Sequence, residues 1–99
     1  MSKYTRIVRT SKRFRKDYKK IQTSSNKKID KLDKIMKKLI NIEKLDPKYN
    51  DHPLKGDWKN FRDCHIEGDW ILIYKLDQDT KDNEIITFHA TDNHSNLFK

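Results

Sequence analysis

The sequence predicts an α+β domain in which two helices pack on one face of a mostly antiparallel four-stranded sheet, in the order β-α-α-β-β-β. In the first half of the chain, apolar residues recur every three or four positions in two segments, which is the period of an amphipathic helix. The second half has three segments rich in β-branched and aromatic residues, separated by polar turns, which is typical of hairpin strands. With 99 residues, we expect a single domain over residues 1–99.

The amino-terminal half is expected to form one strand and two helices. Polar and apolar residues alternate from Tyr4 to Arg9, which indicates a short strand. Ser11 is a favourable N-cap for a helix over about residues 11–23, whose apolar face has the spacing i, i+4, i+7 (Phe14, Tyr18 and Ile21). A second helix is predicted over about residues 27–44 by one continuous apolar stripe: Ile29, Leu32, Ile35, Met36, Leu39 and Ile42. Pro47 lies too close for this helix to continue.

The carboxyl-terminal half is expected to add three strands after a loop at residues 46–57. The strand-like segments are Trp58–Ile66, Trp70–Leu76 and Glu84–Ala90. The middle segment contains a continuous apolar run over residues 71–74, which predicts a central strand covered on both faces.

Charge is distributed unevenly along the chain, whose net charge is +8. Residues 1–48 contain 17 Lys and Arg against 5 Asp and Glu, whereas residues 49–99 contain 6 against 10. The basic half predicts attraction to a polyanion, but RNA, DNA and an acidic protein fit equally well, and solubility alone would also explain it. The sequence has neither an 18-residue apolar run nor the apolar segment of a signal peptide, and its single cysteine, Cys64, cannot form an internal disulfide. We therefore expect a cytoplasmic protein.

Four histidines lie in the acidic half of the chain: His52, His65, His89 and His94. Imidazole titrates near neutral pH, so grouped histidines can supply both a general base and a general acid. Metal-free cleavage of RNA needs both groups, one to take the proton of the attacking 2′-OH and one to protonate the leaving 5′ oxygen. Scattered surface histidines are the simpler explanation of the same residues. A metal site is not predicted, since Cys64 and His65 are adjacent on a predicted strand and point to opposite faces.

Two parts of the sequence resemble the YafQ-type toxins of the RelE-like (RelE/ParE) superfamily, which belong to bacterial type II toxin–antitoxin systems. The central part reads Asp51-His52-Pro53-Leu54-Lys55-Gly56-Asp57-Trp58, then Phe61-Arg62-Asp63-Cys64-His65 and Asp69-Trp70-Ile71-Leu72-Ile73-Tyr74-Lys75. The ending His94-Ser95-Asn96-Leu97-Phe98 is similar to that family's closing motif. The resemblance implies a RelE-like fold and a ribosome-dependent endoribonuclease, an mRNA interferase, that needs no cofactor and is held inactive by an acidic antitoxin.

The resemblance also implies the site residues. The implied catalytic set is His52, His65, Asp69 and His94. We expect His94 to be the general acid, and His65 with Asp69 to take the 2′-OH proton or to orient the group that does. His52 would be a second base or a phosphate contact. Candidates for substrate binding are Trp70, Phe98 and Arg62. Trp70 suits a core position equally well. Phe98 could stack on a base, but an aromatic side chain near the end of a chain more often pins the tail.

One position departs from the family pattern. The family usually has an arginine four residues before its last histidine, where this chain has Ala90. Losing one such charge-stabilising donor typically costs about 10²–10³ in rate. Arg62 is a candidate substitute, but alternation on the strand points it away from His65, and an ion pair with a neighbouring carboxylate explains it equally well. His89 is also expected to face away from the side of Ala90. The alternative therefore stays open that the chain is a catalytically weakened toxin-fold protein, acting as an antitoxin- or RNA-binding module.

The lysine-rich helix faces suit two kinds of partner. They could grip ribosomal RNA through its phosphates, or receive an acidic antitoxin segment that folds on binding. A regulator that binds DNA on its own is the weakest alternative, since the sequence shows no helix-turn-helix pattern with a glycine turn.

Overall fold

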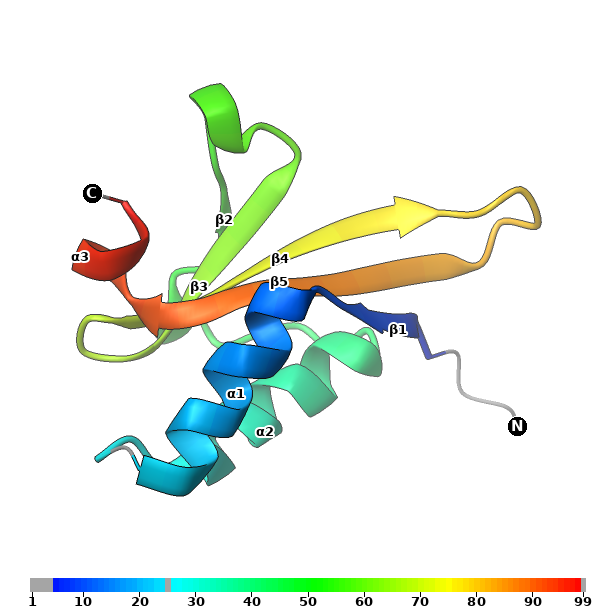
Figure 1. Ribbon diagram of the computed structural model, residues 1–99. Helices are drawn as coiled ribbons and strands as arrows, with labels where there is room; N and C mark the ends of the chain where they lie inside the picture. The colour runs from blue at the N-terminus through cyan, green and yellow to red at the C-terminus, as the bar shows by residue number, and fades with distance from the viewer. Residues whose placement is uncertain (1–4, 25, 99) are drawn as a thin grey trace.

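The computed structural model describes residues 5–24 and 26–98. A sheet with the strand order β1-β5-β4-β3-β2 carries the helices α1 (Lys12–Ser24) and α2 (Ile29–Ile40) on one face (Figure 1). The strands are β1 (Ile7–Thr10), β2 (His52–Pro53), β3 (Phe61–Glu67), β4 (Trp70–Gln78) and β5 (Glu84–Asn93). β1 runs parallel to β5, and the other neighbouring pairs are antiparallel. The predicted class and element order are confirmed, with β2 as a short fifth strand inside the expected loop.

Three short helical turns were not predicted. They are η1 (Pro47–Tyr49), η2 (Gly56–Trp58) and α3 (His94–Leu97). The strand expected from Trp58 therefore begins only at Phe61. The start of the first expected strand, Tyr4, lies outside the described residues. Within the described residues, no helix combines the length and the apolar character needed to cross a bilayer.

The helix ends follow local hydrogen bonding. The Phe14 N–H donates to Ser11 Oγ at 2.9 Å, which confirms the predicted N-cap of α1. α2 ends at Ile40 rather than near residue 44, because Ile42 adopts a left-handed backbone with φ 58°. The Glu43 N–H then donates to the Lys38 carbonyl at 2.9 Å and closes the last turn. Ile42 was expected to point inward, and this was wrong: it is 39% exposed.

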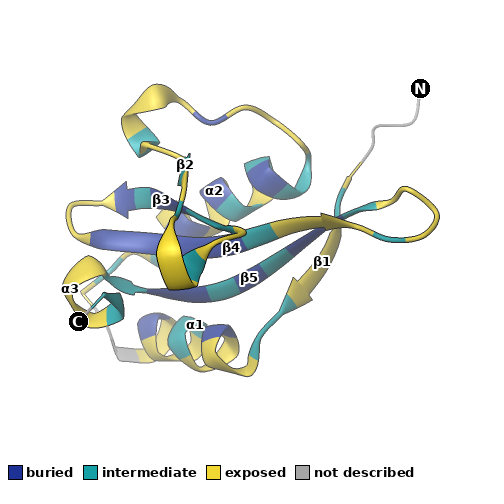
Figure 2. Ribbon diagram, turned by 90° about the horizontal axis from the view of Figure 1, so that it is seen from above, coloured by how far each residue is buried: buried dark blue, intermediate teal, exposed yellow. Residues whose placement is uncertain are grey.

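The hydrophobic core lies between the two helices and the sheet. Phe14 of α1 and Leu32 of α2 are buried there in one cluster with side chains of β3, β4 and β5. The buried parts of the helices and strands are dark blue in Figure 2. The consecutive residues from Trp70 to Tyr74 are all buried, and β4 is the central strand, as the apolar run predicts. The helix-facing side of the sheet contributes Cys64, Ile66, Trp70, Leu72, Tyr74, Ile86 and Phe88. The opposite side, the open face, is not covered by α1 or α2.

A β-bulge in β5 changes the direction in which the His89 side chain points from the one expected. On β4, Ile73 pairs with Ala90 and the next residue, Tyr74, pairs with Phe88, so His89 is an extra residue in β5. The bulge interrupts the regular alternation of side chains. His89 therefore lies against Phe61 on the open face, with ring centroids 4.9 Å apart. Ala90 pairs with Ile73 on the same face, so the expectation that His89 faces away from the side of Ala90 was wrong.

Candidate active site

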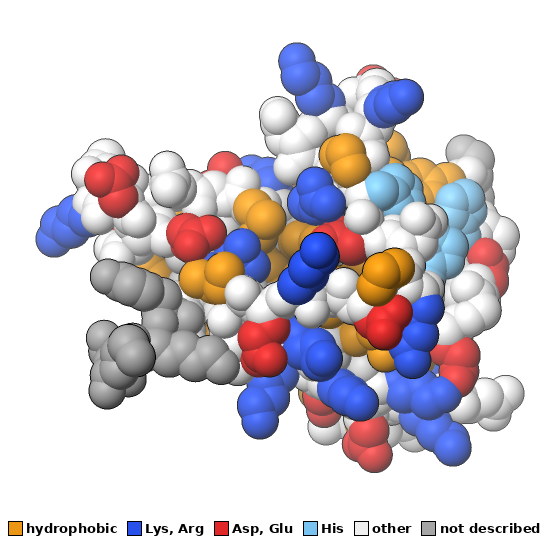
Figure 3. Space-filling view, turned by 180° about the vertical axis from the view of Figure 1, so that it is seen from behind, with side chains coloured by type: hydrophobic (Ala, Val, Ile, Leu, Met, Phe, Trp, Pro, Cys, Tyr) orange, Lys and Arg blue, Asp and Glu red, His pale blue; other side chains and the backbone are white. Residues whose placement is uncertain are grey.

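Three histidines come to one end of the open face from three separate elements. His52 on β2 is the cross-strand partner of Asp63 on β3, so their side chains share a face. His65 follows Asp63 by two positions on the same strand. His94 begins α3, directly after β5. Figure 3 shows histidine side chains gathered in one patch at this end of the molecule.

Asp63 is the functional candidate that the sequence did not identify. Its side chain is only 2% exposed, and its Oδ1 lies 3.3 Å from Nδ1 of His52. Burial raises the pKa of the Asp63 carboxyl group, while positive charge on His52, His65 and His94 opposes that rise. The carboxylate is thus the common electrostatic neighbour of all three histidines. The available signal was its position two residues before His65, which puts both side chains on one face.

The hydrogen bonding of His52 defines its tautomer. Its Nδ1 lies 2.7 Å from the carbonyl oxygen of Asn50. A carbonyl oxygen can only accept, so Nδ1 carries the proton and donates it. In the neutral ring, Nε2 is then left as the proton acceptor. The side chain is 40% exposed, so an external hydroxyl group can reach it.

Asp69 holds the turn that carries His94. The His94 N–H donates to the Asp69 carbonyl at 2.7 Å, and the Ser95 hydroxyl donates to the Asp69 carboxylate at 3.2 Å. The expected pairing of Asp69 with His65 is not among these contacts. These contacts connect Asp69 directly to the turn that carries His94.

Aromatic side chains line the open face beside His94. Phe98 lies 4.7 Å from the His94 ring and 5.5 Å from Trp58, measured between ring centroids. Trp58 in turn contacts Phe61 and His89, both at 5.6 Å. Phe98 is half-buried in this cluster, so it both pins the tail and borders the histidine site.

His89 does not supply the positive charge of the arginine that the family usually has. Burial is the largest cause that lowers the pKa of His89, and the positive charge of Arg13 lowers it further, while Asp17 raises it and Lys75 lowers it. The ring is therefore neutral at physiological pH. Ala90 itself is 1% exposed. The Lys75 ammonium group lies 5.8 Å from the Phe61 ring on this face.

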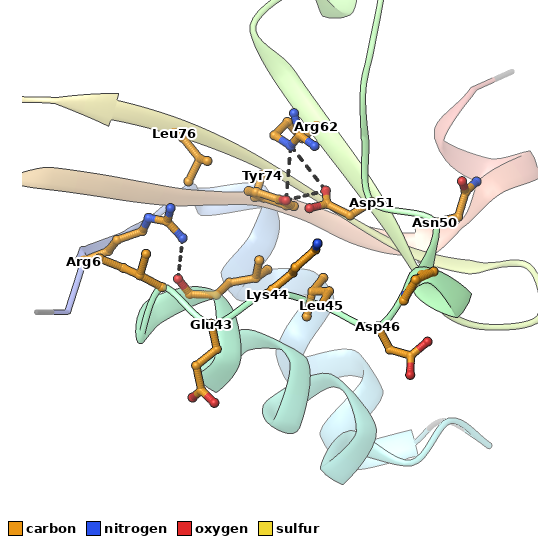
Figure 4. A pocket seen from close by; sticks show the side chains of 13 residues that line it. Arg6, Glu43, Lys44, Leu45, Asp46, Asn50, Asp51, Arg62, Tyr74 and Leu76 are labelled. Carbon is orange, nitrogen blue, oxygen red and sulfur yellow. Dashed lines mark hydrogen bonds and ion pairs between the residues drawn. The ribbon is translucent and has the colours of Figure 1, made fainter. Parts of the chain in front are cut away.

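Two residues expected to contact substrate lie elsewhere. Trp70 is 3% exposed in the core, and its indole N–H donates to the Thr91 hydroxyl at 2.8 Å. Arg62 points away from the histidines, as alternation predicts, and its Nε donates to Asp51 at 3.3 Å and to the Tyr74 hydroxyl at 3.4 Å. Arg62, Asp51 and Tyr74 line a cavity of about 670 Å³ between the sheet and the segment that follows α2 (Figure 4). Neither Trp70 nor Arg62 is placed to bind RNA beside the histidines.

The possible metal ligands are scattered over the described part of the chain. Among the residues that the structure describes, no three His, Cys, Asp or Glu side chains are grouped so that they could hold a metal ion. Cys64 is fully buried, and burial raises the pKa of its thiol.

Comparison with known proteins first defines the fold. The fold is that of the RelE/ParE-like toxins: a YoeB/ParE toxin from Agrobacterium tumefaciens matches with a TM-score of 0.71, over 89% of this chain and 98% of its own, at 16% sequence identity. At that identity the likeness concerns the fold alone. The family follows from a closer match. The model of the YafQ family, bacterial toxins of type II toxin–antitoxin systems, matches residues 6–99, and the chain belongs to this family.

Two relatives from Escherichia coli agree with this assignment. The protein named mRNA interferase toxin YafQ, from strain K12, is 42% identical over 94 residues, which cover 94% of this chain and 96% of the relative. The toxin in a crystal structure of the E. coli DinJ–YafQ toxin–antitoxin complex matches with a TM-score of 0.81 at 41% identity, over 96% of this chain and 99% of its own. The resemblance inferred from the sequence motifs is confirmed.

Proposed function

We propose that this chain is an mRNA interferase, an endoribonuclease that cuts messenger RNA on the ribosome without a metal ion. The observation that carries the proposal is that His52 lies 3.3 Å from the buried carboxylate of Asp63, and that positive charge on His65 and His94 also acts on the pKa of that carboxylate. Three imidazoles at one carboxylate supply the acid and the base that cleavage by a ribose 2′-OH requires. The name of the E. coli relative, mRNA interferase toxin, supports the same activity.

His52 is the proposed general base. Its Nδ1–H is directed to Asn50 and lies beside Asp63, so Nε2 can take the proton of the 2′-OH. The negative charge of Asp63 stabilises the imidazolium that forms, as the aspartate does in a catalytic triad. The 2′ oxygen then attacks the adjacent phosphorus and forms a 2′,3′-cyclic phosphate.

His94 is the proposed general acid. It protonates the 5′ oxygen as the bond from phosphorus to that oxygen breaks, which leaves a free 5′-OH on the second fragment. Asp69 fixes the turn from which His94 projects. His65 lies beside Asp63 on β3, where a protonated ring would stabilise the charge on the phosphoryl oxygens.

A weakened nuclease is the second candidate, and Ala90 is the observation that favours it. The position is 1% exposed and contributes no charge, and the neighbouring His89 is held neutral. The rate is then expected to be about 10²–10³ below that of a relative with an arginine there. In that case binding to RNA or to the antitoxin would be the main activity.

The helices supply the proposed partner surface. Their exposed basic residues are Lys12, Arg13, Arg15, Lys16, Lys19 and Lys20 on α1, and Lys31, Lys34 and Lys37 on α2. Such a surface suits ribosomal RNA and an acidic antitoxin segment. The E. coli relative forms a complex with its antitoxin DinJ. We propose a cognate antitoxin for this chain as well, and action in the cytoplasm, where ribosomes are found.

The test is cleavage of a defined messenger on translating ribosomes, with the cut positions mapped by primer extension. Wild type should cut at discrete positions, and His52→Ala and His94→Ala should each be slower by about 10²-fold or more. Gln78→Ala, at the exposed end of β4, is the control and should cut like wild type. Tight ribosome binding by wild type without any cut would favour the second candidate instead.

A further inference from the structure

The turn that presents His94 cannot hold its own position. α3 has only four residues, and a single helical turn does not form stably by itself. The residue at its N-cap, Asn93, makes no side-chain capping bond with the described residues. The place of His94 must therefore be fixed by contacts from outside the turn. Asp69 supplies one set of contacts, and α1 supplies another.

The α1 contacts begin at the unpaired edge of β5. β1 ends at Thr10, opposite Phe88, so on that side β5 continues without a neighbouring strand among the described residues. α1 lies along this stretch of β5, which leads directly into α3 (Figures 1 and 2). The Thr91 N–H, which would otherwise be an unpaired strand group, donates to Oδ2 of Asp17 at 3.1 Å. A helix side chain thus takes the place of a missing strand.

An ion network extends this contact to the residues around His94. Arg13 lies one turn before Asp17, and its Nε donates to both carboxylate oxygens, at 3.2 and 3.1 Å. Its guanidinium group also lies 3.7 Å from Oδ2 of Asp92. The other oxygen of Asp92 accepts the Asn93 N–H at 2.7 Å and the Asn96 side-chain amide at 3.0 Å. The network therefore reaches both sides of His94 in the sequence.

The surroundings of the two carboxylates support a positioning role. The Asp17 side chain is 12% exposed, on a helix whose exposed face is otherwise basic. Burial alone would raise the pKa of Asp92, but hydrogen bonds from Asn96 and Asn93, with the charges of Lys27 and Arg13, lower it on balance. Asp92 is therefore ionised at neutral pH and attracts the guanidinium group that also binds Asp17.

We propose that Asp17, with Arg13 and Asp92, is a positioning residue that fixes the backbone from Thr91 to Asn96 and thereby aims His94 at the leaving oxygen. The inference rests on the proposed role of His94 as general acid. A displacement of about 1 Å in a catalytic group can cost about 10²-fold in rate. The Asp17 side chain is only 12% exposed and would act through His94, so its loss should lower kcat by more than it changes KM.

The kinetic test compares Asp17→Ala with Asp17→Asn. The alanine variant loses both the Thr91 bond and the Arg13 pair, and its kcat on programmed ribosomes should fall by about 10²-fold. The asparagine variant keeps an acceptor for the Thr91 N–H and should recover most of that loss. Asp33→Ala is the matched control, since it removes an exposed helix carboxylate that accepts from the Tyr18 hydroxyl, away from α3. Its kcat should equal that of wild type.

A double-mutant cycle separates the two proposals. If Asp17 acts through His94, Asp17→Ala should cost less than about twofold in a His94→Ala background. A further loss of about 10²-fold there, or an effect confined to KM, would overturn the positioning role. Full activity of His94→Ala would instead contradict the acid role of His94.

The position of the His94 ring can also be followed in a measurement that does not depend on catalysis. In NMR spectra, Asp17→Ala should shift the ring resonances of His94 and Phe98 and leave those of His52 in place. Unchanged His94 resonances in a folded Asp17→Ala protein would show that α1 does not hold the turn.

Discussion

Replacing Asp63 with asparagine should separate the stability of this protein from its activity. The side chain is 2% exposed, and no described residue donates a hydrogen bond to Oδ1. A buried charged acceptor without a partner costs about 1–3 kcal/mol, part of which the attraction of the histidines offsets. An asparagine side chain would keep the shape of the aspartate and remove its charge. We expect Asp63→Asn to be more stable than wild type by about 1 kcal/mol at pH 8.

The direction of this change in stability follows from the pKa of Asp63. Burial raises the folded-state pKa above the ordinary value, so the folded state favours the protonated carboxyl group. The stability that the protonated Asp63 carboxyl group contributes is fully present at pH values below the ordinary pKa. It is lost as the pH rises through the folded-state pKa. Removing the carboxylate should therefore help stability at pH 8 and should not help at about pH 3, below the ordinary pKa.

Two assays read out this prediction. Thermal unfolding at pH 8 should show a midpoint higher by about 4–8 °C, because 1 kcal/mol corresponds to that shift in a domain of this size. Cleavage should fall by about 10²–10⁴-fold, because the His52 imidazolium loses its counter-charge. Asp77→Asn, which removes an exposed carboxylate on β4, is the control and should change stability by less than about 0.5 kcal/mol. A midpoint lowered by Asp63→Asn at pH 8 would refute the view that this carboxylate is kept at a cost to stability.

Three further predictions concern the fold. Leu32→Ala, at a position with no exposed surface in the core, should lower the free energy of unfolding by about 2–5 kcal/mol in urea denaturation, and a loss under about 1 kcal/mol would contradict the packing described. Ser11→Ala should lower it by about 1–2 kcal/mol, because the α1 cap and the hydrogen bond from the Ser11 hydroxyl to the His89 carbonyl are both lost, and an unchanged value would contradict the cap. Cys64 should react with a thiol reagent only as fast as the protein opens, since burial raises the pKa of its thiol; rapid labelling of the native protein would contradict this.

The elements with a clear period could be predicted from the sequence. The apolar stripe of α2 and the continuous run in β4 each extend over several residues, so their faces and their burial follow from spacing alone. β2 and α3 could not be predicted in this way, because elements of two and four residues are too short to show a period. Both carry proposed catalytic histidines, so the least predictable elements are the ones that build the site.

Some residues of the site could be predicted from the sequence and others could not. His52, His65 and His94 could be named from motif spacing, because a motif records residue identity at fixed positions. Asp63 was not identified, although it lies two residues before His65, since its importance comes from neighbours brought by β2 and α3. The orientation of His89 was predicted wrongly for a related reason. Alternation assumes a regular strand, and the extra residue of a β-bulge leaves no separate mark in the sequence.

The most direct test of the central claim uses a messenger with a single 2′-deoxy nucleotide on the 5′ side of a mapped cut. The proposed chemistry begins with attack by that 2′-OH, so the substituted messenger should stay intact at that position on translating ribosomes. The unsubstituted messenger should be cut there and should yield a 2′,3′-cyclic phosphate and a 5′-OH. Cleavage of the 2′-deoxy messenger at the same position and rate would contradict the account, because the histidines would then be activating a nucleophile other than the ribose.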